Sequence, residues 1–309
     1  MIIKKISLIN VRKIINHHSS FIKETNIIIG KNGVGKTTIL EAIYFLLTTK
    51  SFRKKATKNI VNRKEKRLQI KAELDDKTIS LKYNGKEKKY NKNKQTVKKT
   101  SSILLENTIV CASPEESNPI ESYRSQRLTY FDKIIFKSDV DYIKKIKNYN
   151  KLLLLRNTAL QRKQDEKIWD SLIAEFGIKI WNKRTSFFKE FSKEMEKIEK
   201  KLKIEKKLKI ELKTKETKNN RTYIKSLEKT TKREKTSFGP HMDEIFFYKG
   251  GESVKEQASQ GEKKVFFYIL KFAEVEYLYK IKKEKPLLLI DDFSAKLDNE
   301  NIMKIFNYF

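Results

Sequence analysis

The chain has 309 residues, enough to bury the core of one large domain or of two. Its net charge of +31 at pH 7 favours a polyanionic partner, nucleic acid first, although a compositional bias toward lysine, isoleucine and asparagine explains the excess equally well. The single cysteine, Cys111, excludes an intramolecular disulfide and has apolar neighbours that predict a core residue, and no apolar run has the length of a membrane span or the form of a signal peptide, so we expect a cytoplasmic protein.

A phosphate-binding loop is predicted near the start of the chain. Residues 2–11 have the pattern of a strand, and the apolar run at residues 26–29 is typical of a buried strand. Residues 30–38 then read Gly-Lys-Asn-Gly-Val-Gly-Lys-Thr-Thr, which fits G-x-x-x-x-G-K-[ST] without gaps, and apolar residues continue at helical spacing as far as Leu47. A strand, a glycine-rich loop and a helix in this order are the context in which the motif binds a nucleoside triphosphate.

The residue types of this loop suit phosphate chemistry. Glycines let backbone N–H groups close around phosphate oxygens, where a Cβ would block the approach, and the helix N-terminus adds partial positive charge. Lys36 is expected to reach the outer phosphates, and Thr37 to ligate Mg²⁺. The residues predicted to contact ATP here are Gly30, Lys31, Asn32, Gly33, Val34, Gly35, Lys36, Thr37 and Thr38.

Two alternating strands are predicted next. Residues 68–74 and 78–83 alternate as half-buried strands do, and the Asn84-Gly85 pair signals a hairpin turn. The lysine-rich residues that follow, 84–100, are predicted to form a solvated loop or short edge strands.

The middle of the chain is predicted to be mainly helical. Residues 139–207 contain no proline and one glycine, and their apolar residues recur at helical spacing, which predicts two or three long helices. Residues 208–212 alternate as one strand, and the polar residues 214–235 are predicted to be weakly ordered. The strand pattern returns at residues 245–248, and a helix is predicted over residues 263–280.

The second half of a nucleotide site is predicted after these elements. Residues 286–290 form an apolar strand that ends in Asp291 and Asp292, as Mg²⁺-dependent phosphoryl chemistry requires. Asp291 is expected to hold Mg²⁺ through water, and Asp292 to orient or deprotonate the attacking water. The alternative is an Asp pair at an ordinary strand-to-turn junction.

A short polar motif opens the helix that precedes this strand. Ser259, Gly261 and Glu262 fit either an ordinary capping box or the signature motif of an ABC-type ATPase. The motif lies roughly 30 residues before Asp291. A phosphate loop, then Ser-x-Gly-[Gln/Glu], then an apolar strand with an acidic end is the ABC-type layout.

At this point the chain resembles the RecF family of bacterial DNA replication and repair ATPases, which are related to SMC proteins. Seven blocks stand in the family's order, and together they extend over nearly the whole chain. They are residues 30–44, 51–53, 114–132, 155–160, 239–244, 259–261 and 288–298. SMC proteins carry far longer coiled coils than the roughly 100 residues available here, and ABC transporter subunits lack the Gly-Pro-His of the fifth block.

The fold class follows from the motifs and the resemblance together. We predict an α/β fold, an ABC-type (SMC-like) P-loop ATPase head with an inserted, mainly helical arm domain. Residues 1–112 and 237–309 are expected to form the split ATPase domain, and residues 113–236 the arm.

The resemblance also implies how the site works. It implies a homodimer that forms with ATP and Mg²⁺ and hydrolyses ATP slowly, with DNA as a stimulant. Ser259, Gly261 and Glu262 would contact the γ-phosphate bound to a second subunit, and Asp298 would belong to the D-loop. Arg12 would flank the adenine, unless it is a surface arginine at a strand end.

The biological role implied by the resemblance is recombinational DNA repair. The family binds duplex DNA near single-strand gaps and works with RecO and RecR to help load RecA, in DNA recombination, replication and the SOS response. Arg53, Lys54 and Lys55 are candidates for phosphate contacts on DNA, with a solvated charge run as the alternative.

Departures from the family's pattern leave other functions open. Leu128 replaces an arginine, Glu262 replaces the signature glutamine, and Lys296 replaces the D-loop glutamate. The sequence stops at Phe309, whereas the family normally continues with a helix, one or two strands and the loop that closes over the γ-phosphate. The alternatives are an ATP- and DNA-binding protein that has lost hydrolysis, another SMC-type ATPase, or a decaying gene fragment.

Overall fold

The chain divides into two compact units. The computed structural model describes residues 1–23, 25–53, 56–116, 118–229, 235–295 and 297–309. Unit 1 comprises Met1–Ser117 and Glu274–Phe309, and unit 2 comprises Asn118–Ala273, so the division falls within the long helix α8 (Gln260–Lys282). These units are defined by contacts within the chain, whereas the predicted domains are defined by motifs, and the domain division therefore stays a prediction.

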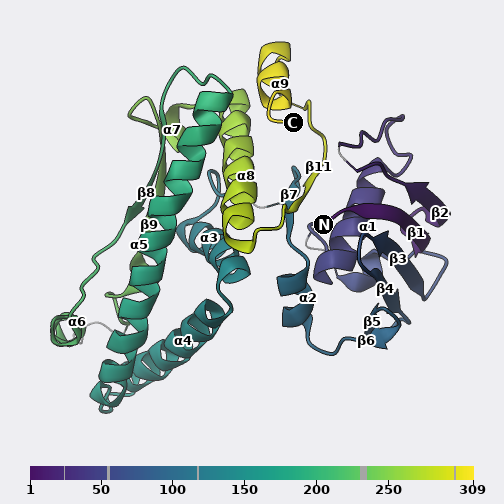
Figure 1. The fold of residues 1–309 in the computed structure, drawn as a ribbon. Helices are drawn as coiled ribbons and strands as arrows, with labels where there is room; N and C mark the ends of the chain where they lie inside the picture. The colour runs from purple at the N-terminus through teal and green to yellow at the C-terminus, as the bar shows by residue number, and fades with distance from the viewer. Residues whose placement is uncertain (24, 54–55, 117, 230–234, 296) are drawn as a thin grey trace. The chain divides into compact units, whose positions relative to one another are not determined.

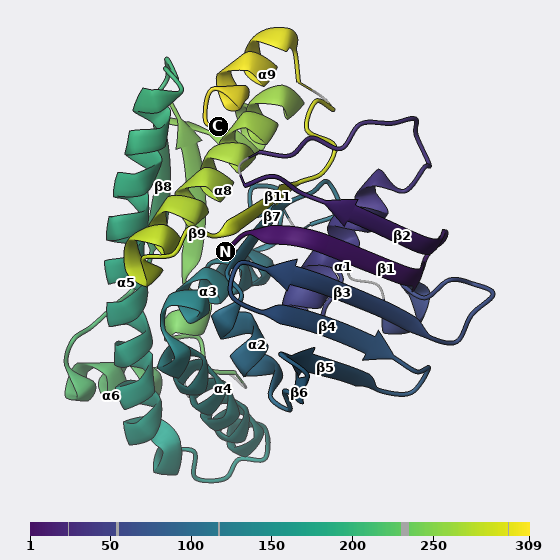
Figure 2. The same cartoon turned by 45° about the vertical axis from the view of Figure 1, so that its right-hand side comes forward.

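An antiparallel sheet of six strands dominates unit 1, in the order β2-β1-β3-β4-β5-β6 (Figure 2). The strands are β1 (Ile3–Val11), β2 (Ile14–Ser20), β3 (Leu68–Leu74), β4 (Thr78–Tyr83), β5 (Lys88–Lys92) and β6 (Gln95–Thr96). Alternate side chains of β3 are buried, which is the period-two pattern of a strand with one covered face. The predictions of strands at residues 2–11, 68–74 and 78–83 are confirmed, and so is the hairpin turn, because β4 and β5 pair antiparallel across it.

Helix α1 (Lys36–Thr48) packs its apolar side chains into the core of unit 1. Its buried Ala42, Phe45 and Leu46 belong to one apolar cluster with Leu8 of β1 and Ile70 of β3. Burying apolar side chains of this size contributes roughly 1.5–3 kcal/mol each. The smaller helical elements of unit 1 are η1 (Thr57–Asn59), α2 (Thr100–Glu106) and α9 (Asn299–Phe306).

Unit 1 also contains a short parallel pair of strands. Strand β7 (Ile109–Ala112) pairs with β11 (Leu287–Ile290), with Ala112 opposite Ile290. Cys111 is buried in β7, as predicted. Because the two strands are parallel, their carboxyl ends meet at one edge, and the amide of Asp291 extends the ladder by donating to the Ala112 carbonyl at 2.8 Å.

The predicted buried strand at residues 26–29 is wrong. These residues form no strand, and the side chains of Ile27 and Ile29 are 67% and 87% exposed. A strand is stabilised only by a neighbour that takes up its backbone hydrogen bonds, and within the described part of the chain no strand pairs with these residues. The apolar run therefore leads into the phosphate loop as an extended, exposed segment.

Unit 2 combines long helices with a three-stranded antiparallel sheet in the order β10-β9-β8. Figure 1 shows α4 and α5 running alongside each other, with β8 and β9 near α5. The helices are α3 (Arg124–Ser138), α4 (Val140–Gln161), α5 (Asp170–Lys201), α6 (Asn220–Glu228), α7 (Val254–Gln257) and the first part of α8. The other elements are β8 (Leu208–Lys213), β9 (Glu244–Lys249), β10 (Glu252–Ser253), η2 (Lys167–Trp169) and η3 (Pro240–Met242).

The long helices, the strands at residues 208–212 and 245–248, and the helix over residues 263–280 are confirmed in unit 2. The prediction of weak order at residues 214–235, of which 230–234 lie outside the described residues, is partly wrong, because this region contains α6. Asn219 caps the start of that helix, because its side chain accepts hydrogen bonds from the amides of Arg221 and Thr222. Tyr223 and Leu227 bury one face of the helix. Across the described residues, no helix combines the length and the apolar character needed to cross a membrane.

Candidate nucleotide-binding site

The phosphate loop joins the exposed segment at residues 26–29 to the start of α1. Gly33 and Gly35 adopt φ angles of 83° and 113°, in the left-handed region where an L side chain is strained. Gly35 is also the last residue before α1, so the free N–H groups of the helix's first turn lie directly after the loop. The local backbone therefore has the form of an anion site, with the helix dipole adding partial positive charge.

Lys36 bends back across this loop. Its Nζ donates hydrogen bonds to the carbonyl oxygens of Gly30, at 2.7 Å, and Lys31, at 2.9 Å. The loop residues Lys31, Asn32 and Val34 expose their side chains, whereas Thr38, in the first turn of α1, is buried. The ammonium group thus lies at the start of the loop.

Thr37 and Asp291 bring the two halves of the predicted site together. The Thr37 Oγ1 donates to Asp291 Oδ1 at 2.9 Å, although 254 positions separate them in the chain. Burial raises the pKa of Asp291, the hydrogen bond from Thr37 and the charge of Arg53 oppose that rise, and the charges of Asp292 and Glu115 add to it. A hydroxyl and a carboxylate side by side are oxygen donors of the kind Mg²⁺ prefers.

This donor set fits Mg²⁺ bound with a nucleotide better than a metal held by protein alone. Among the described residues there is no group of three or more His, Cys, Asp or Glu side chains able to hold a metal ion. Mg²⁺ usually takes only one or two carboxylates from the protein and the rest of its ligands from water and substrate phosphates.

Asp292 follows directly, exposed and with a left-handed backbone at φ 54°. Aspartate is one of the few residues with a side chain that visit this region, and such strain concentrates at functional turns. The chain therefore turns sharply after β11, immediately beyond the residue that contacts Thr37.

Arg12 and Arg53 meet on a buried carboxylate that the sequence had not singled out. Arg12 Nε and Nη2 donate to Glu41 of α1 at 2.5 and 2.8 Å. Arg53 is 20% exposed, and its Nε lies 3.8 Å from Glu41 and 3.4 Å from Glu115. Lys54 and Lys55, the other two candidates for DNA contacts, lie outside the described residues. The one sequence signal for this buried carboxylate is that Glu41 stands among the apolar residues of α1, between Leu40 and Ala42.

The signature residues, in unit 2, have the geometry of a capping box. The amide of Ser259 donates to Glu262 Oε2 at 2.8 Å, and the amide of Glu262 donates to Ser259 Oγ at 3.2 Å, with Gly261 inside this first turn of α8. Lys249 Nζ donates to the same carboxylate at 2.6 Å and, with the Ser259 contacts, lowers the pKa of Glu262 to about 2. The capping-box interpretation is confirmed, and it places Ser259 and Gly261 at the start of α8.

Asp298, the D-loop candidate, begins α9. Its carboxylate accepts from the amide of Asn301 at 2.7 Å, and this hydrogen bond lowers the pKa of Asp298. Asp298 is therefore the N-cap of α9 in unit 1.

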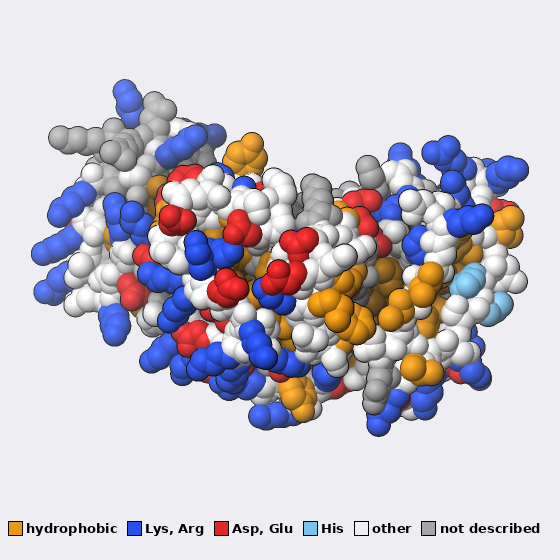
Figure 3. Space-filling model, turned by 90° about the horizontal axis from the view of Figure 1, so that it is seen from above, with side chains coloured by type: hydrophobic (Ala, Val, Ile, Leu, Met, Phe, Trp, Pro, Cys, Tyr) orange, Lys and Arg blue, Asp and Glu red, His pale blue; other side chains and the backbone are white. Residues whose placement is uncertain are grey.

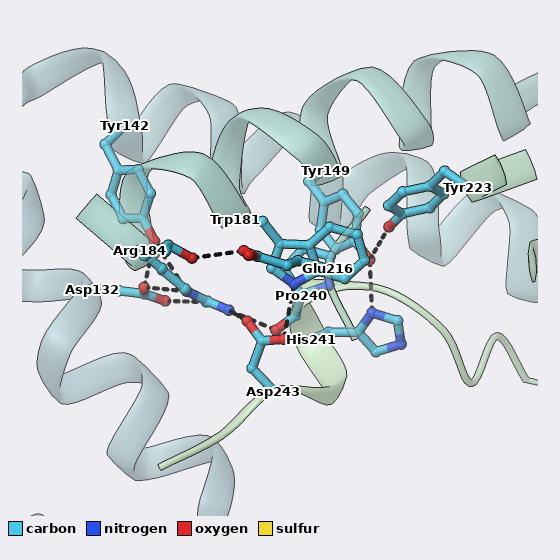
Figure 4. A network of polar contacts seen from close by, with 11 residues as sticks. Asp132, Tyr142, Tyr149, Trp181, Arg184, Glu216, Tyr223, Pro240, His241 and Asp243 are labelled. Atoms are coloured by element: carbon cyan, nitrogen blue, oxygen red, sulfur yellow. Dashed lines mark hydrogen bonds and ion pairs between the residues drawn. The ribbon is translucent and has the colours of Figure 1, made fainter. Parts of the chain in front are cut away.

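Two of the blocks that resemble RecF meet in a buried network in unit 2 (Figure 4). Arg184 of α5 donates to Asp132 at 2.9 Å, to Asp243 at 2.7 Å and to the Pro240 carbonyl at 2.6 Å. The indole of Trp181 donates to the other oxygen of Asp243 at 2.8 Å. The blocks at residues 114–132 and 239–244 thus fasten helix α3 and the η3 turn to α5.

His241 extends the same network and lies in a turn, as predicted. Its Nε2 donates to the Thr236 carbonyl at 3.0 Å, so its Nδ1 accepts from the Tyr149 hydroxyl, 2.7 Å away. Burial is the main reason that the pKa of His241 is lowered. Arg156, from the block at residues 155–160, is also buried and donates to Asp170 at 2.7 Å. These groups are fully engaged in structure, which is why we assign no chemistry to them.

A phosphate loop leading into α1, a hydroxyl–carboxylate contact at the end of β11 and a signature turn at the start of α8 define an ABC-type P-loop ATPase with SMC-like features. The chain matches the family model of the RecF/RecN/SMC N terminal domain over residues 2–309. It belongs to the RecF family of DNA replication and repair proteins.

Individual relatives agree with this assignment. The DNA replication and repair protein RecF of Geobacter metallireducens is 31% identical over 325 residues, covering 98% of this chain and 89% of the relative. A solved structure of the recombination mediator protein RecF with ATP, in the RecFOR pathway, is 28% identical with a TM-score of 0.81, covering 99% of this chain and 88% of that one. An Smc head domain derived from Pyrococcus furiosus, 17% identical with a TM-score of 0.57 over 99% of this chain and 85% of that one, shares the fold.

Proposed function

We propose that this protein is an ATP-dependent, DNA-binding protein of recombinational repair that acts in the RecFOR pathway. The single observation that carries the proposal is the hydrogen bond from Thr37 to Asp291, 2.9 Å long, which joins the phosphate loop to the acidic end of β11. The solved relative that was studied with ATP in that pathway supports the same choice of nucleotide and pathway.

In this proposal the chain's own residues bind and orient the nucleotide. The glycines of the loop and the first amides of α1 surround the phosphates, and Lys36 leaves its two loop carbonyls to pair with the outer phosphates. Thr37 and Asp291 would hold Mg²⁺, and the ion would supply positive charge to stabilise negative charge that develops on the phosphates. Asp292 orients or deprotonates the attacking water, and hydrolysis is slow.

The second half of the proposal is a homodimer that forms with ATP. Ser259, Gly261 and Glu262 of one subunit contact the γ-phosphate bound to the other, with Asp298 contributing from the D-loop and Arg12 flanking the adenine. The capping box supports this role, because it fixes the Ser259 hydroxyl and the first free amides of α8 in one place. ATP then favours the dimer through contacts that exist only when the γ-phosphate is present.

DNA and the RecO and RecR proteins are the proposed partners, with RecA loading at single-strand gaps as the outcome in the cytoplasm. The net charge of +31 supports a polyanionic ligand. Figure 3 shows Lys and Arg side chains spread over the visible face and not confined to one cluster. Arg53 is a weaker candidate for DNA than its sequence suggested, because its guanidinium already lies between two carboxylates.

The test is the molar mass in solution, measured by light scattering with gapped duplex DNA at fixed salt, with and without Mg-ATP. The proposal predicts a shift from monomer to dimer that requires ATP and is lost in Lys36→Ala. Lys71→Ala, on the exposed side of β3, removes the same charge away from the loop and serves as the matched control. An ATP-dependent dimer that survives Lys36→Ala would show that the site is assigned wrongly.

Phosphate release in the same samples separates the two functional alternatives. A dimer that forms with ATP and releases phosphate is the proposed ATPase. A dimer that forms and releases none is a nucleotide-dependent DNA-binding protein without turnover, the second candidate.

A further inference from the structure

Glu41 is a fully buried carboxylate in the helix that follows the phosphate loop. Its side chain has no exposed surface, and its two oxygens accept hydrogen bonds from Arg12, at 2.5 and 2.8 Å, and from the Ser51 hydroxyl, at 2.5 Å. A buried carboxylate is costly unless it is paired and hydrogen-bonded, so this site depends on its arginine. Neither the phosphate loop motif nor the acidic end of β11 requires a glutamate here.

The position of Glu41 ties it to the nucleotide site. It stands four residues after Thr37, so the two side chains lie on the same face of α1, one turn apart. Its partner Arg12 occupies the turn between β1 and β2, and Ile14 at the start of β2 lies 3.4 Å from the point where a Cβ on Gly35 would be. The turn that carries Arg12 therefore packs against the loop itself.

Arg53 connects Glu41 to the metal-binding edge. Its Nε is buried, donates no hydrogen bond within the described structure, and lies between Glu41 at 3.8 Å and Glu115 at 3.4 Å. Glu115 comes shortly after β7 and Asp291 directly after β11, and these parallel strands end side by side. Asp291 and Glu115 thus follow the carboxyl ends of β11 and β7, and the Arg53 guanidinium lies between Glu115 and Glu41.

We propose that Glu41 is a positioning residue of the Mg-ATP site: its buried charge anchors Arg12 beside the phosphate loop and keeps Arg53 from forming a direct ion pair with Asp291. This inference rests on the proposed function. When the charge of Glu41 is removed, Arg53 keeps Glu115 as its ion-pair partner and can move toward Asp291, on which its charge already acts. Its positive charge then competes with Mg²⁺ for the edge, so that more Mg²⁺ is needed to bind ATP.

The experiment measures the Mg²⁺ concentration that gives half-maximal binding of a fluorescent ATP analogue to the full chain. Glu41→Gln keeps the shape of the side chain, and we expect it to raise this concentration about tenfold, the order expected for one unit charge at about 10 Å in a partly screened site. Arg53→Gln removes the competing charge, so we expect it to lower the same concentration. The double variant is expected to return to within about threefold of the wild type, because the two residues act through one contact.

Two control variants separate positioning from stability. Ser51→Ala removes the hydrogen bond to Glu41 and the one that Ser51 Oγ accepts from the Arg53 amide, 3.1 Å away, but it leaves the charges of both side chains in place. We therefore expect it to lower the melting temperature without moving the Mg²⁺ requirement. Glu73→Gln removes a carboxylate from an exposed pair with Lys5, 3.8 Å apart in the same unit, and is expected to change neither.

Opposite shifts for Glu41→Gln and Arg53→Gln support the inference, and an unchanged or raised Mg²⁺ requirement in Arg53→Gln overturns it even if Glu41→Gln does not fold. This inference alone is overturned if the wild type binds ATP with Mg²⁺ and the Glu41→Gln variant needs no more Mg²⁺ than the wild type. A wild-type chain that binds no Mg-ATP overturns the proposed function and this inference together.

Discussion

Arg184 joins three segments of unit 2, and its replacement by methionine tests how that unit is held together. The guanidinium contacts Asp132 at 2.9 Å and Asp243 at 2.7 Å, and the Asp243 side chain is only 1% exposed. Arg184→Met leaves the Asp243 carboxylate buried, with the Trp181 indole among its remaining donors. Breaking a buried pair from one side costs about 3–5 kcal/mol, so we expect a loss of that size in the free energy of unfolding.

Urea unfolding followed by tryptophan fluorescence measures this loss. Both tryptophans, Trp169 and Trp181, lie in unit 2, so the signal reports on the unit that contains the network. Lys183→Met is the matched control, because Lys183 directly precedes Arg184 in α5 and pairs with Asp139, 3.1 Å away, at a more exposed position. A loss of about 1 kcal/mol or less is expected there. A loss for Arg184→Met no larger than that of the control would refute the reasoning.

The pH dependence of the same variant gives an independent check. Burial raises the pKa of Asp243, and Arg184 opposes that rise. Without Arg184 the pKa of Asp243 in the folded state is higher still, so as pH increases Asp243 loses its proton in the unfolded state before it does in the folded state. The destabilisation of Arg184→Met is therefore expected to shrink between pH 7 and pH 4, and a penalty that grows as pH falls would contradict this account.

Two further predictions concern proton-linked stability. The pKa of His241 is lowered below its ordinary 6.5, so the unfolded state takes up its proton first as pH falls, and stability is expected to decrease as pH drops below 6.5. His241→Gln removes that slope in denaturation curves between pH 5 and 8, and an unchanged slope would contradict the assignment. The pKa of Glu262 is lowered from 4.5 to about 2, so its stabilising effect is complete above pH 4.5 and is lost as pH falls toward 2. Glu262→Ala is expected to cost about 1 kcal/mol at pH 7, since its pairing with Lys249 is screened by solvent, and a cost that stays the same at pH 2.5 would show that the carboxylate is not the cause.

The sequence predicted those parts of the fold that depend on local pattern. The alternation in β3 and β4 and the Asn84-Gly85 turn are short-range signals, and the structure follows them. The prediction of a strand at residues 26–29 was wrong because it depends on contacts between distant parts of the chain. A strand depends on a backbone partner elsewhere in the chain, and an apolar run of four residues does not say whether one is present.

The long helices show where periodicity succeeds and where it does not. Apolar spacing located α4, yet Leu155 in it is 39% exposed, while Tyr142, Tyr149 and Arg156 are buried. These three stand seven residues apart and form one stripe of the helix. A stripe made of two tyrosines and an arginine is invisible to a search for apolar letters, because its burial depends on hydrogen-bond partners on other elements.

The candidate site divides in the same way. The phosphate loop and the Asp291 strand were predictable because each is a contiguous motif with its own local context. The contacts of Arg12 and Arg53 with Glu41 were not, because all three are distant in sequence and a charged residue on a helix ordinarily predicts a solvated face. The sequence alone makes Arg53 a candidate for DNA contact or part of a solvated charge run, and its place between two carboxylates is visible only in the folded chain.

The central claim is that Thr37 and Asp291 form the Mg²⁺-dependent part of an ATP site, and the most direct test is an ATP-binding isotherm for Asp291→Asn with and without Mg²⁺. The variant keeps an oxygen that can accept from Thr37, at the 2.9 Å contact seen here, but loses the charge that attracts the metal. The account predicts that Mg²⁺ strengthens ATP binding to the wild type and has little effect on the variant, whose binding without Mg²⁺ is unchanged. Equal strengthening of ATP binding by Mg²⁺ in both proteins would contradict it.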